Sequence, residues 1–132
     1  MLVDAHCHLD APYLLNSLPE VLARARSADV AKIITCGVTP SSNRNCIRIA
    51  ADYPEQVNTS VGYHPHWASG ASNSRLDEVR NQACEPRIAA VGEIGLDFYH
   101  YRSSRQEQKQ LFHSMLEIAS EVKLPVVIHD RN

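Results

Sequence analysis

The chain has 132 residues, of which 44% are hydrophobic and 21% charged, and its 13 Lys and Arg against 15 Asp and Glu give a net charge of −2. This balance is typical of one soluble globular domain, or part of one, and it argues against a dedicated electrostatic nucleic-acid binder, which would be basic. The sequence has neither the roughly 18-residue apolar run of a membrane helix nor a signal-peptide pattern, so a cytoplasmic location is expected.

The cysteines are scattered along the sequence. Cys7, Cys36, Cys46 and Cys84 form no C-x-x-C pair. A disulfide framework or a zinc knuckle would show paired spacing, so these thiols are expected to be reduced and mostly buried.

Five apolar runs rich in β-branched residues have the character of buried parallel strands. The stretches LVDAH, VAKIITC, VNTSVG, IAAVGEIG and PVVIH begin near residues 2, 30, 57, 88 and 125. They recur about every thirty residues, which leaves room for one helix in each gap.

Each gap carries the signal for a helix start. Ser17 with Glu20, and later Ser104 with Glu107, have the spacing of a capping box. Between them, a Thr-Pro pair at 39–40 is a cap with proline at the first helical position, and a third helix is expected over about 74–84. Apolar residues at helical spacing predict the buried faces of the first, third and last helices: Leu18, Val21, Leu22 and Ala25; Leu76, Val79 and Ala83; and Leu111, Phe112, Met115, Leu116, Ile118, Ala119 and Val122.

The alternation of strands and helices predicts an α/β fold with a parallel sheet and right-handed crossovers. Two architectures fit: an open doubly wound sheet, or the first four and a half βα units of a (β/α)8 TIM-type barrel, which typically needs about 250 residues. No G-x-G-x-x-G or Walker loop follows the first strand. Polar residues at the expected strand ends favour the barrel, because these ends converge on one mouth there. Residues 1–132 are therefore expected to form a single partial domain.

The polar residues at these ends are His6, His8, His64, Glu93 and His129. Successive side chains of a strand point to opposite faces, so His6 and His8 share one face. Neutral imidazole is a common ligand of transition metals, which makes the pair a candidate metal site. On its own, the pair is equally compatible with one histidine capping the strand and the other being solvated.

Four ordered motifs cover essentially the whole chain: VDAHCHLD (3–10), VGYHPH (61–66), VGEIGLDFY (91–99) and LPVVIHDR (124–131). In this order and spacing they resemble the TatD family of metal-dependent deoxyribonucleases, among the amidohydrolase-like barrels. The resemblance implies a (β/α)8 barrel that holds two divalent metal ions and hydrolyses DNA phosphodiester bonds, often as a 3′ to 5′ exonuclease on single strands.

The resemblance also assigns roles to residues. It implies that His6 and His8 ligate the first metal. It implies that Glu93 bridges both metals as the catalytic carboxylate and that His129 ligates the second. The family pattern continues with a further His and a further Asp, which this sequence does not contain. The chain is therefore expected to be the amino-terminal half of a longer barrel and to be inactive by itself.

The residue types suit this chemistry. Phosphodiester hydrolysis needs a nucleophile at neutral pH and cations against the developing charge, and two metals about 3.5–4 Å apart supply both. A carboxylate can bridge two cations whereas a neutral imidazole cannot, which favours Glu93 between them. Related amidohydrolases use a carbamylated lysine there, and GEIG contains no lysine. The alternative for Glu93 is a solvated strand-end carboxylate, although Gly92 and Gly95 would let ligands approach closely.

Three residues are candidates for binding a substrate phosphate. His64 and His66 follow the third strand, where contact with a phosphate competes with stacking on Trp67, and His64 is the preferred candidate. Arg131 follows a proposed ligand, and its forked guanidinium could clamp a phosphate or be disordered near the chain end.

Other polar residues have open or minor roles. Asp4 and Asp10 flank the two histidines and could orient an imidazole, or equally be solvated or cap a loop. Asp97 lies just beyond Glu93 and could help to shape the mouth. Surface positions are expected for His100 and His113.

The function expected from the sequence is metal-dependent hydrolysis of DNA. Imidazoles with a carboxylate suit Zn or Mn, and a phosphate substrate suits Mg. One alternative is another amidohydrolase-like enzyme that cleaves small esters or amides. Another is a non-catalytic half-barrel that binds metal or assembles with a partner. The uncovered edges of a half-barrel predict self-association when the chain is expressed alone.

Overall fold

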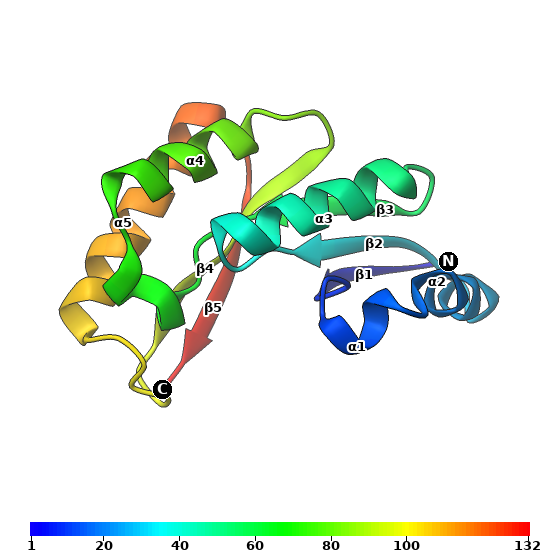
Figure 1. Cartoon of the computed structure of the whole chain (residues 1–132), viewed down its shortest axis with the longest axis horizontal. Helices are drawn as coiled ribbons and strands as arrows, with labels where there is room; N and C mark the ends of the chain where they lie inside the picture. The colour runs from blue at the N-terminus through cyan, green and yellow to red at the C-terminus, as the bar shows by residue number, and fades with distance from the viewer.

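The computed structural model describes residues 1–132 and contains one sheet of five parallel strands in the order β1-β2-β3-β4-β5 (Figure 1). The strands are β1 (Leu2–Cys7), β2 (Val30–Cys36), β3 (Val57–Val61), β4 (Ile88–Asp97) and β5 (Val126–Arg131). All five lie where the sequence predicts strands. Because the spatial order follows the chain without a reversal, the doubly wound alternative is excluded.

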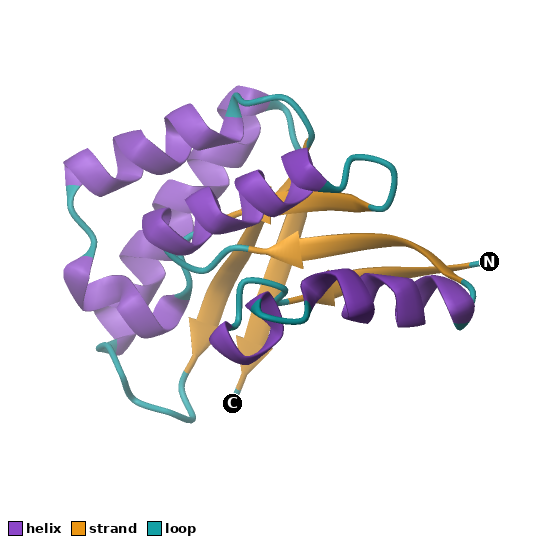
Figure 2. Ribbon diagram, turned by 45° about the vertical axis from the view of Figure 1, so that its right-hand side comes forward, coloured by secondary structure: helices purple, strands orange, loops and turns teal.

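The sheet curls into half of a barrel, and the helices lie along one side of it (Figure 2). This confirms the predicted amino-terminal part of a TIM-type barrel, in which helices cover the outside and side chains fill the inside. The helices are α1 (Pro12–Leu15), α2 (Leu18–Ser27), α3 (Pro40–Asp52), the 3₁₀ helix η1 (Pro65–Gly70), α4 (Asn73–Ala83) and α5 (Arg105–Val122).

The helix starts differ in how well the sequence predicts them. At α5, the Ser104 hydroxyl accepts from the Glu107 amide at 3.2 Å, and the Glu107 carboxylate accepts from the Ser104 amide at 2.8 Å, which confirms this capping box. The capping box predicted at Ser17 is wrong, because the Ser17 side chain makes no capping hydrogen bond. Its backbone, with φ −129° and ψ 23°, continues the turn after α1 instead of adopting the extended conformation of a capping residue.

Two apolar cores lie between the sheet and the helices. In the larger core, α4, α5 and η1 pack against β3 and β4. In the smaller core, α2 and α3 pack against β2 and the first residue of β3. Met115 of α5 is fully buried, as predicted, and Phe112 is partly buried. The prediction that Leu116 belongs to the buried face is wrong, because its side chain is 39% exposed beside the buried stripe.

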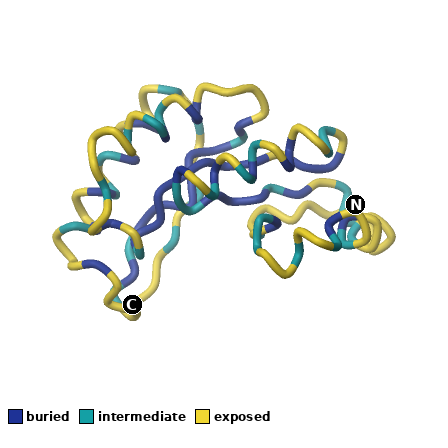
Figure 3. Tube along the Cα trace, viewed as in Figure 1, coloured by how far each residue is buried: buried dark blue, intermediate teal, exposed yellow.

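Burial is greatest in the central strands and falls towards both edges of the sheet (Figure 3). Most residues of β3 and β4 are buried, whereas β1 and β5 are largely exposed. All four cysteines are free, and Cys36 and Cys46 are buried. No helix combines the length and the apolar character needed to cross a membrane.

Candidate metal centre

One carboxylate gathers the polar side chains that the sequence places at the strand ends. Glu93 on β4 is only 4% exposed. Its Oε2 lies 3.2 Å from His6 Nε2 and 3.4 Å from His8 Nε2. Its Oε1 lies 2.8 Å from His129 Nδ1 and 3.8 Å from His64 Nε2. Each oxygen of Glu93 therefore faces its own pair of imidazoles, so the solvated-carboxylate alternative does not hold.

The strand ends themselves lie further along than the sequence analysis places them. Glu93 and His129 sit within β4 and β5, which continue to Asp97 and Arg131. The two strands stay paired through this segment, with Leu96 opposite Asp130. The cluster of polar side chains therefore includes residues within the strands and is not a single ring at the strand ends.

Two glycines allow this close pairing of β4 and β5. A Cβ at Gly92 would lie 2.6 Å from the Cβ of Val127, and one at Gly95 would lie 2.0 Å from the carbonyl oxygen of His129. Gly95 also has φ +141°, a conformation that other residues rarely adopt. The glycines therefore admit the neighbouring strand, and not a ligand as the sequence analysis expects.

The His-x-His pair is held with its ring nitrogens in defined roles. His8 Nδ1 lies 2.9 Å from the carbonyl oxygen of Cys36, to which it donates, so Nε2 is the nitrogen that faces Glu93. The hydrogen bond with Glu93 raises the pKa of His8. Both rings reach the same carboxylate, so neither is a simple strand cap.

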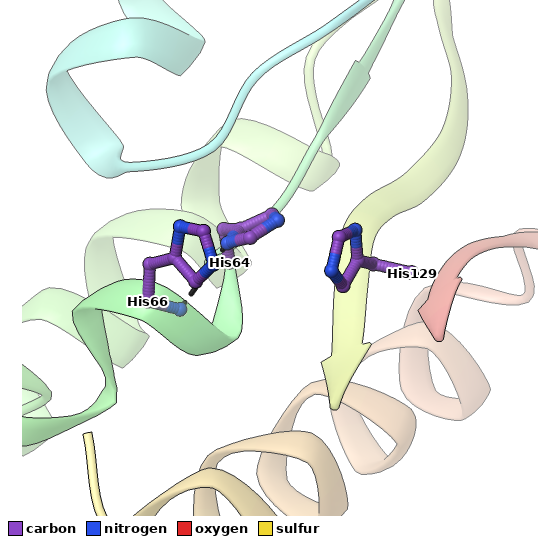
Figure 4. Close-up of side chains that lie close together, drawn as sticks. All are labelled: His64, His66 and His129. Carbon is purple, nitrogen blue, oxygen red and sulfur yellow. Dashed lines mark hydrogen bonds between the residues drawn. The ribbon is translucent and has the colours of Figure 1, made fainter. Parts of the chain in front are cut away.

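The imidazoles of His64, His66 and His129 lie close together (Figure 4). The His64 ring centroid lies 4.4 Å from each of the other two. Stacking of His64 on Trp67 is not what the structure shows, and Trp67 is half exposed. Burial lowers the pKa of His64 to about 4, so this ring is neutral at physiological pH and able to act as a ligand.

Asp97 is the main residue of the site to which the sequence analysis gives no definite role. Its side chain is fully buried, and its Oδ2 lies 2.6 Å from His66 Nε2, 2.9 Å from His100 Nδ1 and 3.0 Å from His129 Nε2. His100 is exposed, as predicted, although one side of its ring lies against this carboxylate. A period of two along β4 places Asp97 on the same face as Glu93, and this signal could have found it.

The remaining candidates lie outside the cluster. The Arg131 guanidinium stacks over the Tyr99 ring at 4.7 Å. Asp4 accepts from the backbone amide of His6 at 3.1 Å, and Asp10 accepts from the Ser42 hydroxyl at 2.6 Å. Neither carboxylate orients an imidazole. His113 is exposed on α5, as predicted.

The carboxylates of the cluster are ionised. Burial alone would raise the pKa of Glu93, but hydrogen bonds from His8 and His129 outweigh it and lower the pKa to about 2. The same balance, with donors from His100, His66 and His129, holds the pKa of Asp97 well below its usual value. Three groups have ligand atoms close enough to hold a metal ion: His6, His8 and Glu93; His64, His66 and His129; and His66, Asp97 and His100. Imidazoles beside ionised carboxylates form a ligand set that suits a divalent cation.

The sequence profile described as TatD related DNase matches residues 3–132. The chain belongs to this family. The TatD resemblance of the four motifs is thereby confirmed over essentially the whole chain.

Individual TatD relatives agree with this assignment. The chain is 34% identical over 129 residues to the 3′-5′ ssDNA/RNA exonuclease TatD of Dickeya dadantii, covering 98% of this chain and 49% of the relative. It is 30% identical over 132 residues to the uncharacterized metal-dependent hydrolase YabD of Bacillus subtilis, covering all of this chain and 51% of the relative.

A solved structure of a TatD homolog also matches nearly the whole chain over about half of its own length. The TatD homolog YjjV of Escherichia coli superposes with a TM-score of 0.92 at 28% identity, over 99% of this chain and 51% of the homolog. The chain thus spans about half the length of the relatives that it matches.

Proposed function

We propose that this chain supplies the metal-binding half of a TatD-type centre that hydrolyses phosphodiester bonds in DNA with two divalent metal ions. The observation that carries the proposal is the position of Glu93, whose two oxygens each face a separate pair of imidazoles. A carboxylate in this position can serve two cations at once, which no imidazole can do.

In this proposal, His6, His8 and Glu93 would hold one ion, and Glu93 and His129 would hold the other. Bound ions would supply a hydroxide nucleophile at neutral pH and neutralise the phosphate charge. The chain itself contributes a permanently ionised Glu93 and a buried, neutral His64 beside it. We assign the contact with a substrate phosphate to His64, which lies beside Glu93, because Arg131 would have to leave Tyr99 to make it.

The substrate and the metal follow from chemistry and from the relatives. The Dickeya relative is named as acting on single-stranded DNA and RNA from the 3′ end, and we extend that activity on single-stranded DNA to the protein that contains this chain. Imidazole and carboxylate ligands suit Zn²⁺ or Mn²⁺, and a phosphate substrate suits Mg²⁺. Hydrolysis of small esters or amides is the second candidate, supported by the name of the Bacillus relative as a metal-dependent hydrolase.

The experiment that tests this function fuses the chain to the half of E. coli YjjV that it does not cover. The chimera should release nucleotides from labelled single-stranded DNA with Mg²⁺, Mn²⁺ or Zn²⁺, and EDTA should abolish the release. Glu93→Gln in the chimera should lower turnover at least about a hundredfold, the scale of losing one preorganised electrostatic element. Full activity of the Glu93→Gln chimera would contradict the two-metal proposal.

A further inference from the structure

We propose that Asp97 is a positioning residue of this metal centre: by accepting a hydrogen bond from His129 Nε2, it fixes the ring tautomer in which His129 Nδ1 is the metal-binding atom. The inference rests on the proposed function, in which His129 is a metal ligand.

The argument begins with the two nitrogens of the His129 ring. Nδ1 lies 2.8 Å from Glu93 Oε1, and Nε2 lies 3.0 Å from Asp97 Oδ2. A neutral imidazole has one N–H donor and one lone pair. Asp97 Oδ2 lies among the ring nitrogens of His66, His100 and His129 and accepts from them, so the N–H belongs on Nε2 when a cation occupies the Glu93 side. The lone pair then lies on Nδ1, beside the carboxylate that would share the ion.

Hydrogen bonds hold the Asp97 carboxylate and backbone in place, so Asp97 stays fixed if the His129 ring turns. Its Oδ1 accepts from the backbone amides of Tyr99 at 3.1 Å and His100 at 2.9 Å. The side chain of Gln108 accepts from the Asp97 amide and donates to the Asp97 carbonyl, both at 2.8 Å. Gln108 is only 1% exposed, so its two hydrogen bonds with Asp97 lie in the buried region between α5 and β4. A carboxylate fixed on both sides makes a firm anchor for an imidazole.

The same carboxylate also orients a second ring of the centre. His66 Nε2 lies 2.6 Å from Asp97 Oδ2, and the His66 ring packs against His64 at 4.4 Å between centroids. Asp97 therefore acts on both rings that flank His64. Carboxylates that hold ligating histidines in this way typically change metal affinity by about 10- to 100-fold when removed.

The first test compares zinc affinity of the wild-type chain with that of Asp97→Asn, measured by competition with a chelating dye. Asn has nearly the same shape but offers one acceptor oxygen and places an NH₂ group among N–H donors. Asp130→Asn is the matched control, because it removes an exposed carboxylate next to His129. We expect about 10- to 100-fold weaker zinc binding for Asp97→Asn, no change for Asp130→Asn, and equal circular dichroism for all three.

A second measurement needs no variant. Long-range ¹H–¹⁵N spectra of the zinc-loaded wild-type chain should show His129 with a metal-bound Nδ1 and a protonated Nε2. Ligation through Nε2, or unchanged zinc affinity in Asp97→Asn, would overturn the role of Asp97 while leaving the metal centre in place. A wild-type chain that binds no zinc would contradict the proposed centre, and this inference with it.

Discussion

At the scale of single residues, Glu93 is the point where distant parts of the chain meet. His6 comes from β1, His64 from the segment after β3 and His129 from β5, yet all three rings lie within 4 Å of its carboxylate. A buried anion without partners would be costly, and these imidazoles stabilise it in place of water. The arrangement gives a buried negative charge surrounded by imidazole nitrogens at the mouth of the half-barrel. A divalent cation could bind there between the carboxylate and the rings.

Much of this cluster can be predicted from the sequence, because position at a strand end is a strong constraint in a parallel barrel. His6, His8 and His129 follow apolar runs directly, so their convergence follows from the topology. Asp97 and His100 could not be placed with equal certainty, since β4 extends four residues beyond Glu93 and only pairing with β5 carries it that far. That pairing depends on a long-range contact and not on local pattern.

The thiols provide a residue-scale prediction. Burial raises the pKa of Cys7 and of Cys46 to about 12, and it also raises the pKa of Cys36, so these groups hold almost no thiolate at pH 8. Cys84 is exposed. Brief treatment of the native chain with iodoacetamide at pH 8 should therefore alkylate Cys84 first, as read by peptide mass spectrometry. In denaturant, all four should react alike; equal rates for Cys46 and Cys84 in the native chain would contradict this burial.

At the scale of elements, the two capping sequences form a matched pair for measurement. Ser104 makes both hydrogen bonds of a capping box, while Ser17 has the same sequence spacing and makes none. Ser104→Ala should lower the free energy of unfolding by about 1 kcal/mol, whereas Ser17→Ala should change it by less than about 0.5 kcal/mol. Urea denaturation of the two variants measures the difference, and equal losses would show that the Ser17 side chain does cap α2.

The length of an element determines whether the sequence predicts it. Every strand and every helix of ten or more residues is predictable, because periodicity accumulates over such lengths. The helices α1 and η1, with four and six residues, are too short to show a period, and both begin at a proline that equally marks a turn. Because η1 carries His66, the contact between His66 and Asp97 was not predicted either.

At the scale of the whole molecule, the sheet has two uncovered edges. Val3 on β1 is 61% exposed, and Ile128 on β5 is 55% exposed. Parallel strands are normally covered on both faces, and free apolar edges pair readily with other strands. We therefore expect the chain to associate with a second copy of itself, seen by sedimentation as a dimer or larger species.

Variants can show whether these edges cause the association. Lysine on an edge strand opposes pairing, so Val3→Lys combined with Ile128→Lys should shift the chain towards the monomer. Leu116→Lys, on the partly exposed face of α5, serves as the control and should leave association unchanged. A wild-type chain that sediments as a monomer at all concentrations would contradict the prediction.

The chain alone should also be inactive on DNA. In the proposed centre, His6, His8, Glu93 and His129 would leave open positions around the two ions, and the chain spans about half the length of its relatives. Incomplete ligand sets hold metal weakly and position it poorly for hydrolysis. Nucleotide release from single-stranded DNA by the purified chain, sensitive to EDTA and to Glu93→Gln, would contradict this expectation.

The metal content of the chain is the most direct test of the account, because every proposed role depends on ions held by these side chains. The chain, the double variant His6→Ala/His8→Ala and the control His113→Ala are purified without chelator, and bound zinc per chain is measured for each by equilibrium dialysis against the same saturating zinc concentration. The double variant should hold about one ion fewer than the wild type, with the ion between Glu93 and His129 retained, and the control should be unchanged. Equal metal content in all three proteins would contradict the claim that His6 and His8 are metal ligands.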